Sequence, residues 1–335
     1  MSQITTKDRS DSPIESGATK SRSRTAVDRF LTTGALVVLF TIFSITANNF
    51  FTLRSVLSLI LQTSTVTLMG IGVTFIIITG GIDLSIGSVI ALTGTIAVMA
   101  ADANIPIWLS MVLGLATGVV CGAVNGLLVT RLKLPPFIAT LGMMMVVRGL
   151  VLTITNANSR PAPEAFGTLG NGSVFSYGQK FPGIAFPVII MIAAAFIFHF
   201  ILRWMRIGRY TYAVGSNEEA ARLSGINVNR VKIITYVIGG FLSALSGIIL
   251  ASRMVTSQPN GGIGYELNAI AAAVIGGTSL MGGSGTVAGT VIGSFIMGVL
   301  TVGLTMQGAN YFMQQIVIGV VVIGAVAFDQ LRSGR

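Results

Sequence analysis

The sequence predicts an all-α, polytopic membrane protein of about ten transmembrane helices, arranged in two halves of inverted topology with both termini in the cytoplasm. Three observations support this fold class. The 335 residues are 52% hydrophobic and only 10% charged, whereas soluble domains carry about 25% charged residues. The apolar residues gather in windows of about 20, the length that crosses a bilayer. Features of the first half also recur in the second half.

The expected spans follow one another from residue 30 to residue 328. They lie at about 30–47, 57–79, 86–101, 107–129, 138–155, 185–202, 234–252, 267–280, 286–305 and 312–328. The third and eighth are short, and Gly-rich turns flank both. Residues 1–29 read as a disordered basic tail, 30–329 as the transmembrane domain and 330–335 as a C-terminal tail. The first helix is expected to be retained, because this tail is longer than the basic region of a signal peptide.

The basic residues predict the orientation. If residues 1–29 lie inside, sixteen Lys and Arg side chains are cytoplasmic. Four lie outside: Arg54, Arg160, Lys180 and Arg253. This asymmetry follows the positive-inside rule. It also accounts for the net charge of +10 without nucleic acid as a partner.

The inside loop 203–232 contains a helical signal within SNEEAARLSG. Ser216 or Asn217 can cap the helix, Glu218 and Glu219 occupy its first turn, and Gly225 can end it. A helix of two turns in a basic loop has little reason to form unless it packs on something. The alternative is a helix that lies on the membrane surface.

The two halves correspond at an offset of five spans. GGIDLS (80–85) follows the second span and GGIGYELN (261–268) the seventh, so that Asp83 matches Glu266 and Ser85 matches Asn268. These two acidic starts are expected at opposite ends of the inverted halves. Glycines four residues apart predict close helix packing: Gly114, Gly118, Gly122 and Gly126 in the first half, and Gly285, Gly289 and Gly293 in the second. A rival match at six spans pairs GGIDLSIGS with GGTSLMGGS (276–284).

Several longer stretches resemble the permease subunits of ribose-type sugar importers of the ATP-binding-cassette (ABC) class. They are NNFFT (48–52), GGIDLSIGSVIALTG (80–94), PFIATLGMM (136–144), GRYTYAVGSNEEAARLSGINVNRVKI (208–233) and QPNGGIGYELNAIAAAVIGGTSLMGGSGT (258–286). With the last span, they run in family order from about residue 30 to residue 328. Permeases for other monosaccharides and for furanosyl signal molecules share much of this pattern.

The resemblance implies a transport subunit of the bacterial inner membrane, for D-ribose in the first place, and not an enzyme. Its implied partners are a second permease copy, a cytoplasmic ATPase and a periplasmic sugar-binding protein. The chain contains no GxxxxGK[ST] phosphate loop. ATP and Mg²⁺ are therefore expected on the ATPase, and no cofactor or metal on this chain.

The resemblance also makes the short loop helix a coupling helix that docks in a groove of the ATPase. An amphipathic segment suits such docking. Ala220, Ala221 and Leu223 can form its apolar face. The whole expected segment is Glu218, Glu219, Ala220, Ala221, Arg222, Leu223, Ser224 and Gly225.

Charged and polar residues within the spans are candidates for the translocation path or its gate: Asp83, Ser85, Arg148, Glu266 and Asn268. Asp83 can instead cap the helix that follows, or contact the sugar directly. Arg148 can pair with Asp83 or Glu266, reach a headgroup, or bind backbone carbonyls. The neutral candidates, each of which can instead bond a neighbouring helix, are Gln62, Asn125, Gln307, Asn310, Gln314 and Gln315.

Two other functions fit parts of the pattern. An ion-coupled secondary transporter would share the inverted repeat, but it would have no use for the 208–233 segment. A non-transporting scaffold or receptor would have no use for Asp83 and Arg148 inside the spans.

Overall fold

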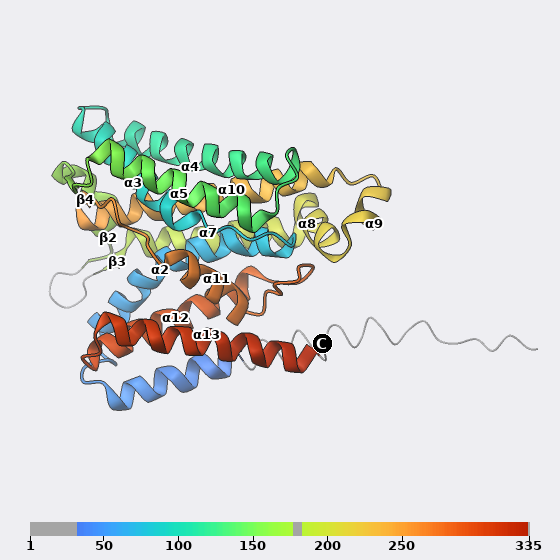
Figure 1. Cartoon of the computed structure of the whole chain (residues 1–335). Helices are drawn as coiled ribbons and strands as arrows, with labels where there is room; N and C mark the ends of the chain where they lie inside the picture. Colours follow the sequence, from blue (N-terminus) through green and yellow to red (C-terminus); the bar gives the residue numbers. More distant parts are fainter. Residues whose placement is uncertain (1–31, 177–182, 334–335) are drawn as a thin grey trace, which may run out of the picture.

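The computed structural model describes residues 32–176 and 183–333, and in these ranges the ten expected spans are ten apolar helices (Figure 1). They are Thr32–Thr46, α2 (Leu53–Ile78), α3 (Ile86–Asp102), α4 (Ile107–Thr130), α5 (Pro136–Thr155), α7 (Phe186–Trp204), α10 (Val228–Met254), α11 (Tyr265–Ile275), α12 (Val287–Met306) and α13 (Tyr311–Ser333). The third and the eighth are short, as predicted. The expected tail at 1–29 lies outside the described residues, and α13 covers most of 330–335.

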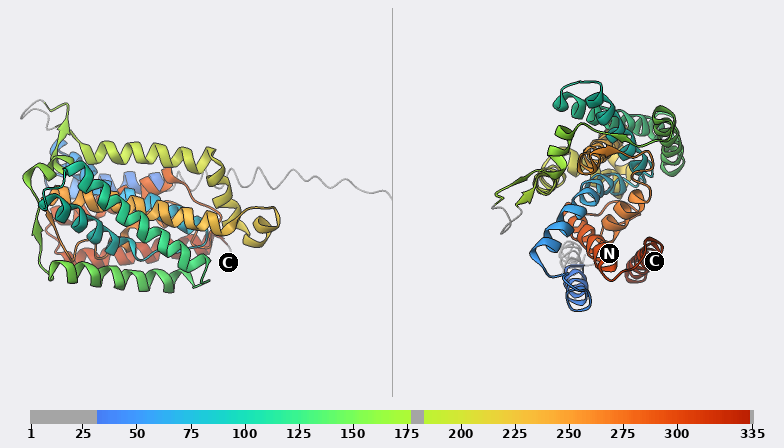
Figure 2. Two further views of the ribbon diagram at one scale, coloured as in Figure 1. Left: turned by 90° about the horizontal axis from the view of Figure 1, so that it is seen from above. Right: turned by 90° about the vertical axis from the view of Figure 1, so that its left-hand side faces the viewer.

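Short elements lie at both ends of the bundle (Figure 2). At one end, α8 (Arg206–Ser216) and α9 (Glu218–Leu223) fill the loop for which only one helix is predicted. At the other end lie η1 (Glu164–Gly167), α6 (Thr168–Asn171) and two antiparallel ladders. In the ladders, β1 (Arg160–Pro161) pairs with β4 (Thr256–Ser257), and β2 (Ser173–Val174) pairs with β3 (Ile184–Ala185). The loop expected at 156–183 therefore contains regular structure.

The basic residues separate between the two ends of the bundle. Gly126 near the end of α4 packs on Ile233 near the start of α10, so both lie at the α8–α9 end. The described basic residues of this end are Arg131, Lys133, Arg203, Arg206, Arg209, Arg222, Arg230 and Lys232. Those of the opposite end are Arg54, Arg160 and Arg253. The charge asymmetry of the sequence is thus an asymmetry between two faces.

Helices α2 and α10 form the centre of the fold and run antiparallel. Ser246 of α10 donates to the Thr65 carbonyl of α2 at 3.2 Å. Further along the pair, a Cβ added to Gly72 would lie only 2.9 Å from Gly239 Cα, so the two backbones touch. Glycine permits this approach because it carries no side chain.

Each central helix packs on the next two helices of the other half. Helix α10 packs on α3 and α4, while α2 packs on α11 and α12. The glycine stripe predicted on α4 faces α10, where Gly118 lies against Ala244 and Gly126 lies against Ile233. Helices α2, α3 and α4 thus correspond to α10, α11 and α12, and each central helix packs on the two helices that follow its counterpart. Together with the antiparallel central pair, this is the arrangement that an inverted repeat produces.

The second glycine series is shorter than expected. Gly289 and Gly293 lie on α12 and leave no room for a side chain beside Gly276 and Ala272. Gly285 instead precedes α12, in a loop, with φ of +156°. A Cβ there would lie 2.8 Å from Thr278. Its glycine is therefore required by loop geometry and not by packing between helices.

Candidate functional site

The first break in the helices is the turn 79–85 between α2 and α3, and Asp83 is buried in it with 2% of its surface exposed. Asp83 Oδ1 accepts the Ser85 backbone N–H at 2.8 Å and the Ser85 hydroxyl at 2.6 Å. Asn125 of α4 donates to Ser85 Oγ at 2.8 Å and to the Asp83 carboxylate at 3.4 Å. The carboxylate is therefore held by polar donors, and no described residue forms an ion pair with it.

The turn differs in detail from the helix cap considered for Asp83. Ser85 occupies the cap position of α3 and makes no side-chain capping bond. Asp83 binds the N–H of this capping residue and not that of the first helical turn. Tyr236 of α10 and Thr140 of α5 both donate to the Ile82 carbonyl, at 3.4 and 3.2 Å. Three helices thus anchor the non-helical turn.

The second break is the non-helical segment that follows α10. Residues 258–264 precede α11 and lie beside α3, where Gly262 packs on Gly87 in its first turn. Arg148 of α5 donates from Nη1 to the Pro259 carbonyl at 2.6 Å and to the Gly261 carbonyl at 3.0 Å. Non-helical backbone at membrane depth needs such partners within the protein. Among the roles open to Arg148, the structure therefore has it bind backbone carbonyls.

Glu266 lies in the first turn of α11 and faces the start of α3. Its Oε1 accepts the Gly264 N–H at 3.2 Å, and its Oε2 lies where a side chain on Gly87 would be. The two acidic helix starts therefore lie at one junction, so the expectation of opposite ends is wrong. The reason is that 258–264 runs along α3 before α11 begins.

Asn268, the counterpart of Ser85, takes no part in this junction. It lines a cavity of about 390 Å³ between α2, α10, α11 and α12, together with Gln62, Arg253 and Tyr265. Thr63 and Thr65 also line this cavity, and both hydroxyls are buried without a hydrogen-bond partner. The cavity thus combines polar groups with enough space for a small hydrophilic molecule.

Four of the neutral candidates have local bonds, and Gln62 among them donates to Ser58 of its own helix, α2, at 3.1 Å. Gln307 donates to Thr46 at 2.8 Å, joining α12 to the first helix. Gln314 donates to Thr305 at 3.1 Å, and Asn310 accepts the Met313 N–H at the start of α13. The last three side chains bond neighbouring helices and turns, the alternative left open for them.

Helix α9 is the short helix predicted at 218–225. Asn217 Oδ1 accepts the Ala220 N–H at 2.9 Å, so Asn217 and not Ser216 is the cap. Gly225 follows the helix with φ of +82°, a conformation that favours glycine. Glu218 forms ion pairs with Arg222 at 3.0 Å and with Lys232 of α10 at 2.6 Å.

The apolar face expected on α9 is divided between two directions. Ala221 is only 4% exposed and packs on Val214, Val228 and Val231 of α8 and α10. Leu223 is 85% exposed at the tip of the loop. Ala221 therefore attaches α9 to its own chain, and Leu223 is the large apolar side chain open to a partner.

Helix α8 joins α9 to the first break. Gly215 lies against the Ile78 carbonyl at the end of α2, with no room for a side chain. The same carbonyl accepts the Gly283 N–H at 2.9 Å, and Tyr212 donates to the Gly285 carbonyl at 2.6 Å. The loop before α12 and the end of α2 therefore meet on α8, next to the turn that holds Asp83.

Sequence reasoning missed Gly215, Tyr212 and Tyr236. The GRYTYAVGS stretch contains the first two, but the sequence pattern predicts a loop there. Read as a helix, it would place Tyr212 and Gly215 on one face, three residues apart. Nothing in the pattern around Tyr236 distinguishes it from other residues of an apolar helix.

The described part of the chain offers no cluster of three or more His, Cys, Asp or Glu side chains that could hold a metal ion. The polar groups of the two breaks are suited to holding backbone and meeting neutral polar molecules.

The sequence of this chain is similar to a known protein family. Residues 55–326 match the family described as "Branched-chain amino acid transport system / permease component". Relatives include the ribose import permease protein RbsC of Escherichia coli K12, 43% identical over 89% of this chain and 92% of the relative. RbsC of Bacillus subtilis 168 is also 43% identical, over 89% and 91%. The D-allose transport system permease protein AlsC of E. coli K12 is 36% identical, over 91% and 93%.

Proposed function

We propose that this chain, which belongs to this family of permease components, is the membrane-spanning subunit of an ABC importer for a small sugar. The first candidate substrate is D-ribose. The observation that carries the substrate is the identity of 43% to ribose import permeases over about nine-tenths of the chain. The permeases for D-allose and L-arabinose are less similar, at 36% and 34%. The subunit is a transport component, and ATP and Mg²⁺ belong to a separate ATPase.

Three partners complete the proposed importer in the bacterial inner membrane. A periplasmic binding protein delivers the sugar to the end with Arg54, Arg160 and Arg253. A cytoplasmic ATPase docks at the opposite end, where the described basic residues are concentrated. A second copy of the permease forms the other wall of the path.

The ATPase is proposed to bind α9 through Leu223, with Glu219 and Arg222 at the edge of the contact. The contacts of α8 then carry a displacement of α9 to the end of α2 at Ile78 and to the loop at Gly283. Both segments lead directly into the turn of Asp83 or into α12. Closure of the ATPase modules therefore acts on the helix breaks and opens the path outward, and hydrolysis resets it.

The second copy is proposed to cover the face formed by α5, α3, α11 and α13, which pack on one another in that order. This face carries Arg148 and Glu266, both only partly buried, beside exposed Ile263 and Leu267. Lipid is a poor solvent for these two charges, because ionisable groups at membrane depth favour the protein interior or water. In the right-hand view of Figure 2, α5 in green and α13 in dark red lie on the same side of the molecule.

The proposal is tested in vesicles that contain the chain with its ATPase, with the binding protein added outside. Ribose uptake is expected to require ATP in the compartment of the ATPase, together with the binding protein. Allose and arabinose, offered with their own binding proteins, provide the comparison of substrates. Uptake by the chain alone under an ion gradient would instead establish a secondary transporter and overturn the proposal.

A further inference from the structure

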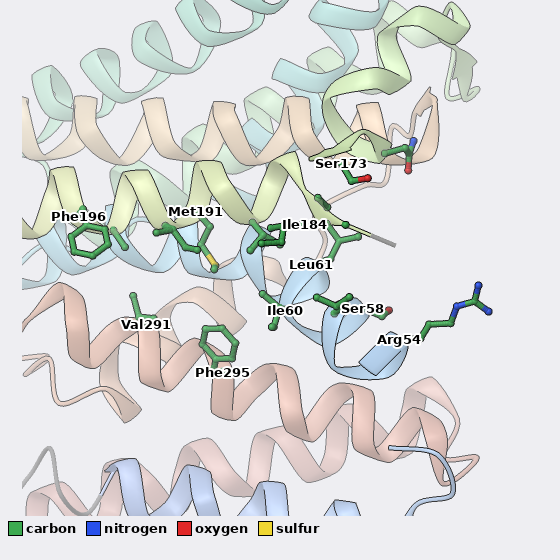
Figure 3. Close-up of a pocket in the computed structure, with 17 residues that line it drawn as sticks. Arg54, Ser58, Ile60, Leu61, Ser173, Ile184, Met191, Phe196, Val291 and Phe295 are labelled. Carbon is green, nitrogen blue, oxygen red and sulfur yellow. The ribbon is translucent and has the colours of Figure 1, made fainter. Parts of the chain in front are cut away.

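A second and larger cavity lies apart from the site described above. It is an open groove of about 680 Å³ between α2, α7 and α12, roofed at one end by β2 and β3 (Figure 3). Its lining on α7 includes Val188, Ile192 and Ala195, which share one helix face, and Ala185 directly before the helix also lines it. The groove therefore runs along the helix axes and not across the bundle.

The groove is polar at one end only. Arg54, Ser58 and Ser173 lie at the end beside the ladder, while Phe196, Val291 and Phe295 line the deep end (Figure 3). From its first residue, Phe186, to Phe196, helix α7 rises about 15 Å, at 1.5 Å per residue. One leaflet of a bilayer has a hydrocarbon depth of about 15 Å. The length and polarity of the groove thus match one leaflet, from headgroup level to midplane.

Arg54 at the mouth has no protein anion beside it. It is exposed, and no described Asp or Glu forms an ion pair with it. Figure 3 shows its guanidinium extending beyond the end of the groove. A planar guanidinium can bind two phosphate oxygens in bidentate geometry. A ligand with an anionic group and an apolar chain therefore fits the groove, with the anion beside Arg54 and the chain against the apolar deep end.

We propose that this groove binds one acyl chain of an anionic phospholipid such as phosphatidylglycerol, with the phosphate and headgroup at Arg54. The apolar lining excludes a sugar, and the single cation at leaflet-surface level favours a lipid over a helix of a second copy. The bound lipid ties α7 to α2 and α12, on the side of the protein away from α5.

The test uses the purified full chain, stripped of lipid in detergent and titrated with phosphatidylglycerol or phosphatidylcholine, with bound lipid counted by native mass spectrometry. The wild type is expected to prefer phosphatidylglycerol about fivefold, as one basic residue near a membrane surface gives about 1 kcal/mol. Arg54→Gln is expected to bind both lipids equally. Ala195→Phe, which fills the groove, is expected to weaken both at least tenfold. Ala193→Phe on the exposed side of α7 is the matched control and is expected to behave as wild type.

A second pair of variants covers the event that Ala195→Phe does not fold. Ala195→Cys is expected to react with an apolar maleimide more slowly when phosphatidylglycerol is present, and Ala193→Cys at an unchanged rate. The native Cys121 is buried. Equal lipid binding by Ala195→Phe and Ala193→Phe, or an unchanged preference in Arg54→Gln, would overturn the proposal. So would a groove-filling variant that loses a second copy of the chain while retaining its lipid.

Discussion

Replacing Arg148 by Met tests whether this side chain holds the non-helical segment 258–264 in place. Met is apolar and has a similar length, so it removes the bonds to the Pro259 and Gly261 carbonyls while filling much of the same space. Polar bonds within membrane proteins average about 0.6 kcal/mol and reach about 1.7. The two bonds together predict a loss of about 1 to 3 kcal/mol in the free energy that keeps this segment closed.

Amide hydrogen exchange measures this local free energy, because exchange requires the segment to open. A loss of about 1 to 3 kcal/mol corresponds to exchange that is roughly 5 to 150 times faster at residues 258–266. Arg148→Lys is the control, since one ammonium can donate to both carbonyls that Nη1 now binds. The lysine variant is expected to stay close to wild type and to retain uptake. Unchanged exchange at 258–266 in Arg148→Met would refute the reasoning.

Three further predictions concern the first break and its connection to α9. Asn125→Ala leaves Ser85 and Asp83 without their donor from α4; we expect about 1–3 kcal/mol lower stability in mixed-micelle unfolding, and equal stability would contradict the network. Leu223→Asp is expected to preserve the melting temperature but to abolish co-purification of the ATPase, whereas Ala221→Asp, which buries a charge, should lower the melting temperature; ATPase binding retained by Leu223→Asp would refute the docking proposal. Gly215→Val, which has no room beside the Ile78 carbonyl, is expected to abolish sugar-stimulated ATP hydrolysis, and wild-type stimulation would show that α8 does not transmit the signal.

Much of the fold follows from hydropathy because a bilayer imposes length on its helices. The ten helices lie where the apolar windows predict them, and the glycines of α4 pack on α3 and α10 because small residues let helices approach closely. The start of α10 is predicted too late, at 234, since its first turn is polar and lies on α8 and α9 outside the apolar window. Hydropathy contains no signal for such an extension.

The candidate site is harder to predict because its groups meet through tertiary packing. Asp83 and Glu266 are visible in the sequence as acidic helix starts, but their common junction depends on the path of 258–264 along α3. The partners of Arg148 are backbone carbonyls, which no residue type identifies. Likewise, Ala221 and Leu223 lie about 200° apart on a helical wheel and so on opposite faces of α9, and only the position of α8 decides which face is buried.

The contact between Gly87 and Gly262 has a consequence for how the protein is made. Its two members belong to different halves of the chain, and each would clash with any side chain on the other. During synthesis, the first turn of α3 enters the bilayer long before its covering segment leaves the ribosome. Until then, Asp83 has its donors Ser85 and Asn125, but its turn lacks the bond from Tyr236 to the Ile82 carbonyl. The first five helices therefore lack these contacts until the second half is inserted, so the native packing at the start of α3 is completed only after both halves are made.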